Sequence, residues 1–487
     1  MTAALLMLAT LLVYFAALLL LAVRNRHKAD NSTFFRANNN SPWWMVGFGM
    51  IGASISGVSF ISVPGWVAET GMTYLQMCLG FFFGYLAVAF VLLPLYYRLQ
   101  LTSIYSWLGL RYGPSAHRTG AIFFLLSKLT GAAARLYLVC LVLQEFVFGP
   151  LGIPFEISAA VLLLLIWLYT NMSGVHTIVR TDVVQTACLL LALGWMVCIA
   201  LGHLEIGALD ALQQLCASEM SKVFEWEASD PQAFWRQFLS GAFIVVAMTG
   251  LDQDMMQKNL TCRTLRDAQK EMCAYGACFL PVNALFLFLG FLLYSICQTE
   301  GITPASGDSL LPSLVASGAL GSLVVVPFSI GIVAAAFSSA DSALTALTTS
   351  CCIDLLGIES KGWDKEKAVR VRRLIHIIII GSCLLFVLLF RHLNDSNILN
   401  TIYVMASYTY GPLLGLFAFG MFSKRSVKTW AIPCIAIAAP LICRWLDVCA
   451  PRLWGFSFGY ELLLLNGALT TLGLFLFSKK FKAASLQ

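Results

Sequence analysis

The chain has 487 residues, of which 59% are hydrophobic and only 11% are charged, and its formal net charge is +6. A soluble domain typically contains about 25% charged residues, so this composition excludes a soluble globular protein and indicates a polytopic membrane protein. The sequence contains no P-loop, GxSxG, HExxH or dinucleotide fingerprint, the motifs that would indicate ATP hydrolysis or a soluble type of catalysis. We therefore expect no enzyme activity.

Thirteen apolar segments follow one another along the chain and predict thirteen transmembrane helices. They cover residues 2–23, 43–66, 74–97, 119–149, 155–173, 178–202, 235–251, 273–297, 320–352, 374–390, 398–421, 429–445 and 460–478. Most of them reach the roughly 20 residues that a helix needs to cross a bilayer. The first segment has no basic stretch before it and is followed by Arg24, Arg26 and Lys28. It therefore predicts a retained helix and not a cleaved signal peptide.

The basic residues predict the orientation in the membrane. Most of the 31 Lys and Arg residues lie in one set of alternate loops, whereas the longest loop on the other side, 204–233, is acidic. Cytoplasmic loops carry the excess of Lys and Arg, so we expect the N-terminus outside and the C-terminus in the cytoplasm of a plasma (inner) membrane. This bias explains the net charge, so we expect a lipid bilayer and no nucleic acid as the surroundings of the chain.

The second apolar segment, 43–66, is dense in glycine and serine and predicts a broken helix. Glycine weakens a helix by roughly 0.5–1 kcal/mol per residue, and serine side chains compete for backbone hydrogen bonds, so we expect a break near Ala53–Ser56. Unwound backbone at membrane depth lines cavities, and its carbonyls hold cations. A second glycine-flanked segment, 240–250, would make a pair typical of inverted repeats. The alternative for both is a packing face of small residues.

Two of the charged residues within the predicted spans, Arg135 and Asp182, each have two interpretations. Arg135 is in the middle of its span, with Lys128 on the same helix face, and a membrane arginine needs an anionic partner. That partner is either a protein carboxylate such as Glu145 or the carboxylate of a substrate. Asp182 opens the sixth span, where it either caps the helix or faces the segment 331–354.

Segment 331–354 places hydroxyls and a carboxylate on one stripe of a helix that is too apolar to face water. At about 100° per residue, one sector holds Ala335, Ser338, Ser342 and Thr345, with Ser339 and Asp341 at its flanks. Converging oxygen ligands suit a small hard cation, and a carboxylate within the membrane indicates function. The alternative is helix packing through Ser and Thr.

The remaining polar segments and the cysteines have simpler interpretations. The polar residues of 250–258 and 264–270 predict a solvated cytoplasmic hinge loop followed by a short amphipathic helix. The fifteen cysteines show no CxxC pair, so we interpret them as small buried hydrophobic residues.

Together these segments resemble the sodium:solute symporter family, which includes bacterial proline, sugar and sialic acid transporters. The motifs that carry the resemblance are GASISGVSF at 52–60, T-D-x-x-Q at 181–185, G-x-D-Q-x-x-x-Q-[KR] at 250–258 with A-Q-K at 268–270, and A-x-x-S-S-A-D-S at 335–342. The resemblance implies an all-α integral membrane protein with a leucine-transporter-like fold of two inverted five-helix repeats.

The resemblance also implies how the chain is divided. We expect a single transmembrane transporter domain over 1–487. Its parts are an extra N-terminal helix and loop at 1–42, a first repeat plus the start of the second at 43–251, a second repeat at 235–421, and extra C-terminal helices at 422–487.

The site residues that the resemblance implies fall into three groups. The main sodium site would use Gly52, Ile55, Ala335, Ser338 and Ser339. A second sodium site next to it would use Asp182, Ser338, Asp341 and Ser342. The substrate would contact Ser54, Ser56, Ser59, Gln76 and Arg135.

We therefore expect a sodium-coupled symporter that imports a small organic solute by alternating access, with Na⁺ as the coupling ion and a monomeric functional unit. Residues 245–248 lack the Asn/Tyr pair of the sugar branch, so the solute is expected to be carboxylated, as a sialic acid, amino acid or monocarboxylate is. The alternatives are a proton-coupled or neutral sugar/polyol symporter of the same fold, with Asp341 or Asp182 as the proton carrier, and a membrane sensor that does not transport.

Overall fold

The computed structural model describes residues 2–24, 34–35, 40–101, 103–173, 175–303, 307–358, 361–393 and 398–479, nearly all of them in helices. The longer helices are α1 (Thr2–Arg24), α3 (Trp43–Ser54), α4 (Gly57–Gly65), α6 (Tyr74–Ala87), α7 (Leu93–Leu99), α9 (Pro114–Leu143), α10 (Phe155–Ser173), α11 (Val175–His203), α13 (Phe234–Val245), α14 (Gln253–Asn259), α15 (Leu265–Glu300), α17 (Val325–Ser350), α18 (Lys365–Leu393), α19 (Ile398–Phe422), α20 (Ala431–Trp454) and α21 (Leu462–Leu476). Short helices connect them, namely α5 (Val67–Thr70), α8 (Ser106–Tyr112), α12 (Ala208–Ala217) and α16 (Leu310–Ser317). Two-residue strands β1 (Ser426–Val427) and β2 (Ser478–Lys479) pair antiparallel.

The helices that could span a membrane agree with the predicted segments. Among the described residues, nine helices are long and apolar enough to cross a bilayer, two further spans are bent pairs, and two shorter apolar helices accompany them. These correspond one for one to the thirteen predicted apolar segments, so the prediction of an all-α membrane protein is confirmed.

Both predicted helix breaks are present. Helices α3 and α4 meet at an angle of 58°, because Ile55 leaves the helical region with φ −79° and ψ 88°. The second bend, of 69°, separates α13 and its last turn from α14. Asp252 begins α14 by accepting hydrogen bonds from the amides of Asp254 and Met255, which is the usual role of an N-cap residue.

The prediction of a solvated hinge loop at 250–258 is wrong. All seven residues of α14 are buried, including Asp254 and Lys258 at 3% and 2% exposed. Residues 264–270 are also no separate amphipathic helix, because Thr264 caps α15 and the segment forms its first turns. Polar composition suggested solvent, but the charged side chains have partners within the protein.

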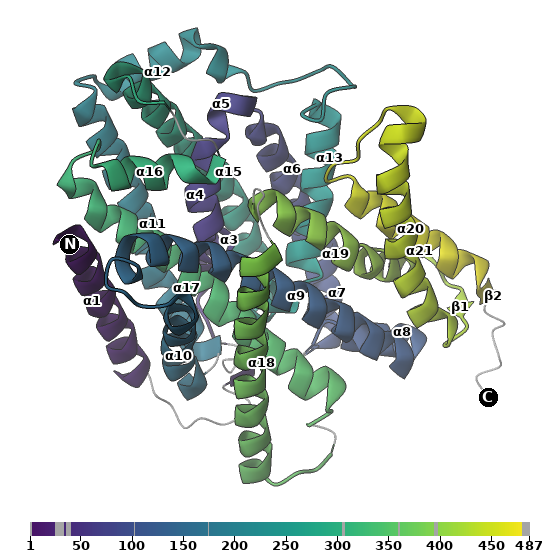
Figure 1. Ribbon diagram of the computed structural model, residues 1–487. Coiled ribbons are helices and arrows are strands. Elements are labelled where there is room, and N and C mark those ends of the chain that lie inside the picture. Colours follow the sequence, from purple (N-terminus) through teal and green to yellow (C-terminus); the bar gives the residue numbers. More distant parts are fainter. Residues whose placement is uncertain are drawn as a thin grey trace.

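Helix α17 lies in the interior and α18 at the periphery. In the apolar window of Ser322–Leu355, 83% of residues are buried, compared with 22% for Lys365–His392. Figure 1 shows α3 to α5 near the middle of the bundle, with α1 on one flank and α20 and α21 on the other. The segments with polar side chains are therefore those that the fold encloses.

Close approaches of helices depend on glycine at a few positions. A Cβ atom on Gly80 of α6 would lie 2.1 Å from the carbonyl oxygen of Phe238 in α13, and one on Gly241 would lie 2.4 Å from the carbonyl oxygen of Met77. Because backbone atoms stand opposite both positions, neither contact is relieved by a change of rotamer. The α6–α13 interface therefore accepts only glycine at these sites.

Gly80→Ala is expected to destabilise the protein by about 1–3 kcal/mol, the usual cost of overpacking a filled interior. The matched control is Gly194→Ala in α11, where a Cβ meets nothing within 4 Å and helix propensity favours alanine by roughly 0.5–1 kcal/mol. The measurement is the thermal unfolding midpoint of each purified protein in detergent. Equal midpoints for the two variants would contradict the close α6–α13 contact.

Candidate cation and substrate site

The break between α3 and α4 leaves carbonyl groups without their helical donors, those of Gly52 and Ile55 among them. The amide of Ser56, which would donate to the Gly52 carbonyl in a continuous helix, donates to the Ser54 carbonyl at 3.0 Å. Among the described residues, neither the Gly52 nor the Ile55 carbonyl accepts a loop or cap hydrogen bond. Both residues are buried. Free carbonyls in a buried break are the groups that hold cations in discontinuous membrane helices.

The oxygen-bearing face of α17 lies against this break. A Cβ on Gly57, the first residue of α4, would lie 3.5 Å from the Ile332 carbonyl oxygen, one turn before Ala335. Ser338 and Ser339 are both buried, and the Ser339 hydroxyl donates to the Ala335 carbonyl at 2.8 Å. The structure thus brings the two predicted halves of the main sodium site to the same junction.

Asp182 is not a helix cap. Helix α11 begins at Val175, so Asp182 lies two turns inside it, fully buried. Its Oδ1 accepts the Ser338 hydroxyl of α17 at 2.7 Å, and its Cβ would be only 2.9 Å from a Cβ on Gly49 of α3. Of the two interpretations of Asp182, the one in which it faces segment 331–354 is therefore confirmed.

Lys258 completes the surroundings of Asp182. Its Nζ lies 2.8 Å from Asp182 Oδ2, and the two side chains are 3% and 1% exposed. This role of Lys258 is not evident from the sequence, because a lysine at the end of a polar run resembles a solvated residue. The available signal was its spacing from Asp254, since i and i+4 residues share one helix face.

The other carboxylate of the candidate second sodium site, Asp341, accepts two hydroxyl groups. Tyr169 of α10 donates to Asp341 Oδ2 at 2.9 Å, and Ser342 donates to Oδ1 at 3.2 Å. Both aspartates, Ser338 and Ser342 are buried, so the four predicted members lie in one interior region. Tyr169 was missed, because an aromatic residue in an apolar span carries no sign of its partner.

Lys128 binds the second break and not a substrate. Its Nζ lies 3.1 Å from Asp252 Oδ2 and 2.8 Å from Asp254 Oδ2, and its side chain is 5% exposed. The Tyr410 hydroxyl of α19 also donates to Asp252. The ammonium group of α9 therefore holds the bend before α14 in place.

Arg135 has no carboxylate partner in the part of the chain that the structure describes. It is half-buried, and its charge acts on the hydroxyls of Tyr403 and Tyr410. Glu145, the protein partner considered above, is exposed and forms no ion pair with it. One alternative for Arg135 was an ion pair with a protein carboxylate such as Glu145, and the structure contains no ion pair between these two residues.

The remaining predicted substrate residues have different surroundings. Ser54 shares a hydrogen bond with the Tyr275 hydroxyl, which also accepts from Tyr85 at 2.7 Å. Ser56 and Ser59 are buried beside the break. Gln76 is instead occupied by the segment 218–233, because its amide donates to the Gln232 carbonyl at 2.9 Å and its oxygen accepts the Glu225 amide at 3.1 Å.

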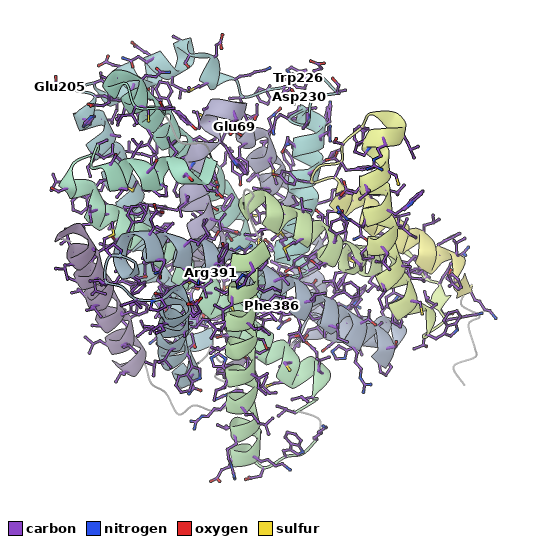
Figure 2. The ribbon with its side chains drawn as sticks, in the orientation of Figure 1. Glu69, Glu205, Trp226, Asp230, Phe386 and Arg391 are labelled. Atoms are coloured by element: carbon purple, nitrogen blue, oxygen red, sulfur yellow. The ribbon has the colours of Figure 1, made fainter. Side chains whose placement is uncertain are left out.

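A small pocket lies beside Gln76 at the end of the molecule that carries α5 and α12. It has a volume of about 230 Å³ and is lined by Trp66, Glu69, Thr70, Tyr74, Gln232, Gln237 and Tyr460. Figure 2 shows Glu69, Glu205, Trp226 and Asp230 at this end. The Tyr74 hydroxyl lies 3.4 Å from that of Tyr403, the tyrosine on which Arg135 acts. One wall of the pocket, Tyr74, is therefore linked through Tyr403 to the arginine.

The model of the sodium:solute symporter family matches residues 34–436. The chain is 24% identical to the human sodium/iodide cotransporter, covering 77% of this chain and 59% of the relative. It is 24% identical to the sodium/sialic acid symporter NanT of Aliivibrio fischeri, covering 82% and 79%, and 25% identical to the sodium/sialic acid symporter SiaT of Proteus mirabilis, covering 81% and 79%. The match thus spans less than two thirds of the human cotransporter.

Two solved structures share the fold. A substrate-bound, outward-open Na⁺-coupled sialic acid symporter superposes with a TM-score of 0.81 at 20% identity, covering 98% of this chain and 99% of the other. The nucleobase-cation-symport-1 transporter Mhp1 superposes with a TM-score of 0.54 at 14% identity, covering 92% and 95%. These likenesses confirm the expected fold class. Because the family model covers most of the chain, this protein belongs to the sodium:solute symporter family.

Proposed function

We propose that this protein is a sodium-coupled secondary active symporter that imports a small carboxylated solute by alternating access. The observation that carries the proposal is the junction between the α3–α4 break and α17, where the Gly52 and Ile55 carbonyls lack loop or cap donors and Ser338 and Ser339 are buried nearby. The names of relatives from bacteria to man, which are sodium symporters and cotransporters, add support.

In this proposal the main sodium ion is bound by the carbonyls of Gly52, Ile55 and Ala335 and by the hydroxyls of Ser338 and Ser339. A sodium ion that enters down a potential of ~100 mV contributes about 2.3 kcal/mol before its concentration gradient is counted. That energy corresponds to more than tenfold accumulation of a solute, at ~1.4 kcal/mol per decade. Because the ion joins α3 and α4 to α17, sodium and solute would strengthen each other's binding equally.

The solute is proposed to bind between the break and Arg135, in contact with Ser54, Ser56 and Ser59. The half-buried guanidinium favours a carboxylate because charges within a membrane protein are normally paired and a guanidinium fork fits a carboxylate in a bidentate manner. Gln76, the fifth predicted contact, would act from the side of segment 218–233, which its amide group holds. Relatives named for sialic acid and for monocarboxylates agree with this solute class.

The remaining features of the proposal concern the membrane. The acidic end with Glu69, Glu205 and Asp230 (Figure 2) would face outside, so that the N-terminus is outside and the C-terminus cytoplasmic in a plasma (inner) membrane. One chain in the bilayer would be the functional unit. Asp182, Ser338, Asp341 and Ser342 form a second proposed cation position, and Lys258 lies within it.

Ser339→Ala is expected to raise the sodium concentration for half-maximal stabilisation about tenfold, since ~1.4 kcal/mol of binding energy corresponds to one decade. The measurement is the thermal unfolding midpoint of the purified protein as sodium replaces potassium at constant ionic strength. Ser329→Ala is the matched control, because Ser329 is on the same helix and makes the same kind of bond, to the Val325 carbonyl at 2.7 Å. A wild-type protein that does not respond to sodium would refute the proposed function.

Arg135→Ala is expected to abolish stabilisation by the solute while sodium still stabilises the protein, because only the solute would contact the guanidinium. The measurement is a thermal-shift screen against carboxylated sugars, amino acids and monocarboxylates, with and without sodium, since a bound ligand raises the midpoint. Arg391→Ala, which removes a partly exposed arginine paired with Glu156, is the control. Solute binding that survives in Arg135→Ala, or uptake driven by a pH gradient without sodium, would contradict the assignment.

A further inference from the structure

The two proposed cation positions differ in how far protein donors already satisfy them. At the main position, the carbonyls of Gly52 and Ile55 accept no loop or cap hydrogen bond among the described residues. At the second position, Asp182 Oδ1 accepts the Ser338 hydroxyl at 2.7 Å, and Oδ2 forms an ion pair with Lys258 Nζ at 2.8 Å. Asp341 likewise accepts Tyr169 and Ser342. The first position offers oxygen atoms without donors, whereas at the second position the Lys258 ammonium already faces the carboxylate.

The ammonium group of Lys258 is fixed where it stands. Lys258 belongs to α14, whose seven residues are all buried. Its backbone carbonyl accepts the Thr261 hydroxyl at 2.7 Å. Lys128 holds the start of the same short helix through Asp252 and Asp254. A lysine side chain on the protein surface would leave its partner readily. Lys258 is instead buried, and the short helix that carries it is held at its start by Lys128.

Lys258 also acts on more than one carboxylate. Its ammonium interacts electrostatically with Asp182, Asp254 and Asp341, and Asp254 is in addition paired with Lys128. The carboxylates that would attract a second sodium ion are thus the same ones that face Lys258. A sodium ion beside Asp182 would have to compete with a charge of the same sign already at 2.8 Å.

We propose that the Lys258 ammonium is a tethered cation that occupies the second cation position beside Asp182, so that the protein binds one sodium ion and not two. This inference rests on the proposed sodium symport and specifies its stoichiometry. In this arrangement the lysine neutralises the carboxylate in every transport cycle without leaving the protein. Each solute molecule is then driven by the gradient of a single sodium ion.

The test is equilibrium binding of radioactive sodium to the purified full chain in a potassium background, without any solute. Wild type is expected to bind one sodium ion per chain. Lys258→Met removes the ammonium but keeps the length of the side chain, and it is expected to bind two, because Asp182 then lacks a cation. The sodium dependence of the unfolding equilibrium gives the same count. Above its Kd, each sodium site raises the ratio of folded to unfolded protein tenfold for every tenfold increase in sodium concentration.

Two further variants identify where the added ion binds. Lys258→Arg keeps the charge and is expected to bind one sodium ion, and the double variant Lys258→Met/Asp182→Asn, which removes both charges, is expected to return to one. Should Lys258→Met fail to fold, Asp182→Asn alone decides the matter: it keeps one sodium ion if the proposal holds, whereas a fall from two to one overturns it.

The outcomes separate this inference from the proposed function. Two sodium ions in wild type, or one in a folded Lys258→Met protein, would overturn the tethered cation but leave sodium symport intact. A wild-type chain that binds no sodium at all would instead overturn the proposed function.

Discussion

The carboxylate of Asp182 joins three helices that are far apart in sequence. It packs against Gly49 of α3, accepts the Ser338 hydroxyl of α17 and pairs with Lys258 of α14. Removing one partner from a buried ion pair costs ~3–5 kcal/mol, because the other charge stays buried without compensation. One side chain thus contacts both broken segments and the hydroxyl-bearing helix. Whatever binds at the α3–α4 break is bound within reach of this carboxylate.

The broken segments provide what a continuous helix lacks. In a continuous helix the Gly52 carbonyl would be occupied by the Ser56 amide, which here donates to Ser54. At the second break the Gly250 and Leu251 carbonyls accept the hydroxyls of Tyr96 and Tyr105. Asp252 accepts hydrogen bonds from the first amides of α14. The two breaks thus differ: the first leaves buried carbonyls without hydrogen-bond donors among the described residues, whereas side chains of the protein satisfy those of the second.

The sequence was sufficient for features that depend on local pattern. The apolar segments predicted the spans, and the glycines and serines of 43–66 predicted a break near Ala53–Ser56. The spacing of Ser338, Ser342 and Thr345 predicted one polar face on α17. It was insufficient where the partner is distant. Lys128 and Asp252 are 124 positions apart, so the sequence does not show that they form an ion pair. The polar run at 250–258 therefore looked solvated, although Asp252, Asp254 and Lys258 each have an oppositely charged partner in the folded protein. The roles proposed for the sodium and substrate residues stay predictions, as do the repeat boundaries.

The distribution of carboxylates among the basic residues argues for the role of Arg135. Lys128 forms ion pairs with two aspartates and Lys258 with one. Placing a charge within the membrane costs ~2.5–3.5 kcal/mol on insertion scales, for arginine as well as for lysine. For Arg135 the described residues provide the hydroxyls of Tyr403 and Tyr410 but no carboxylate. This difference from the two lysines supports the proposed contact between Arg135 and the carboxylate of a solute. The Tyr403 hydroxyl, on which Arg135 acts, lies 3.4 Å from that of Tyr74, and Tyr74 lines the pocket beside Gln76. These two tyrosines therefore connect the arginine with the pocket.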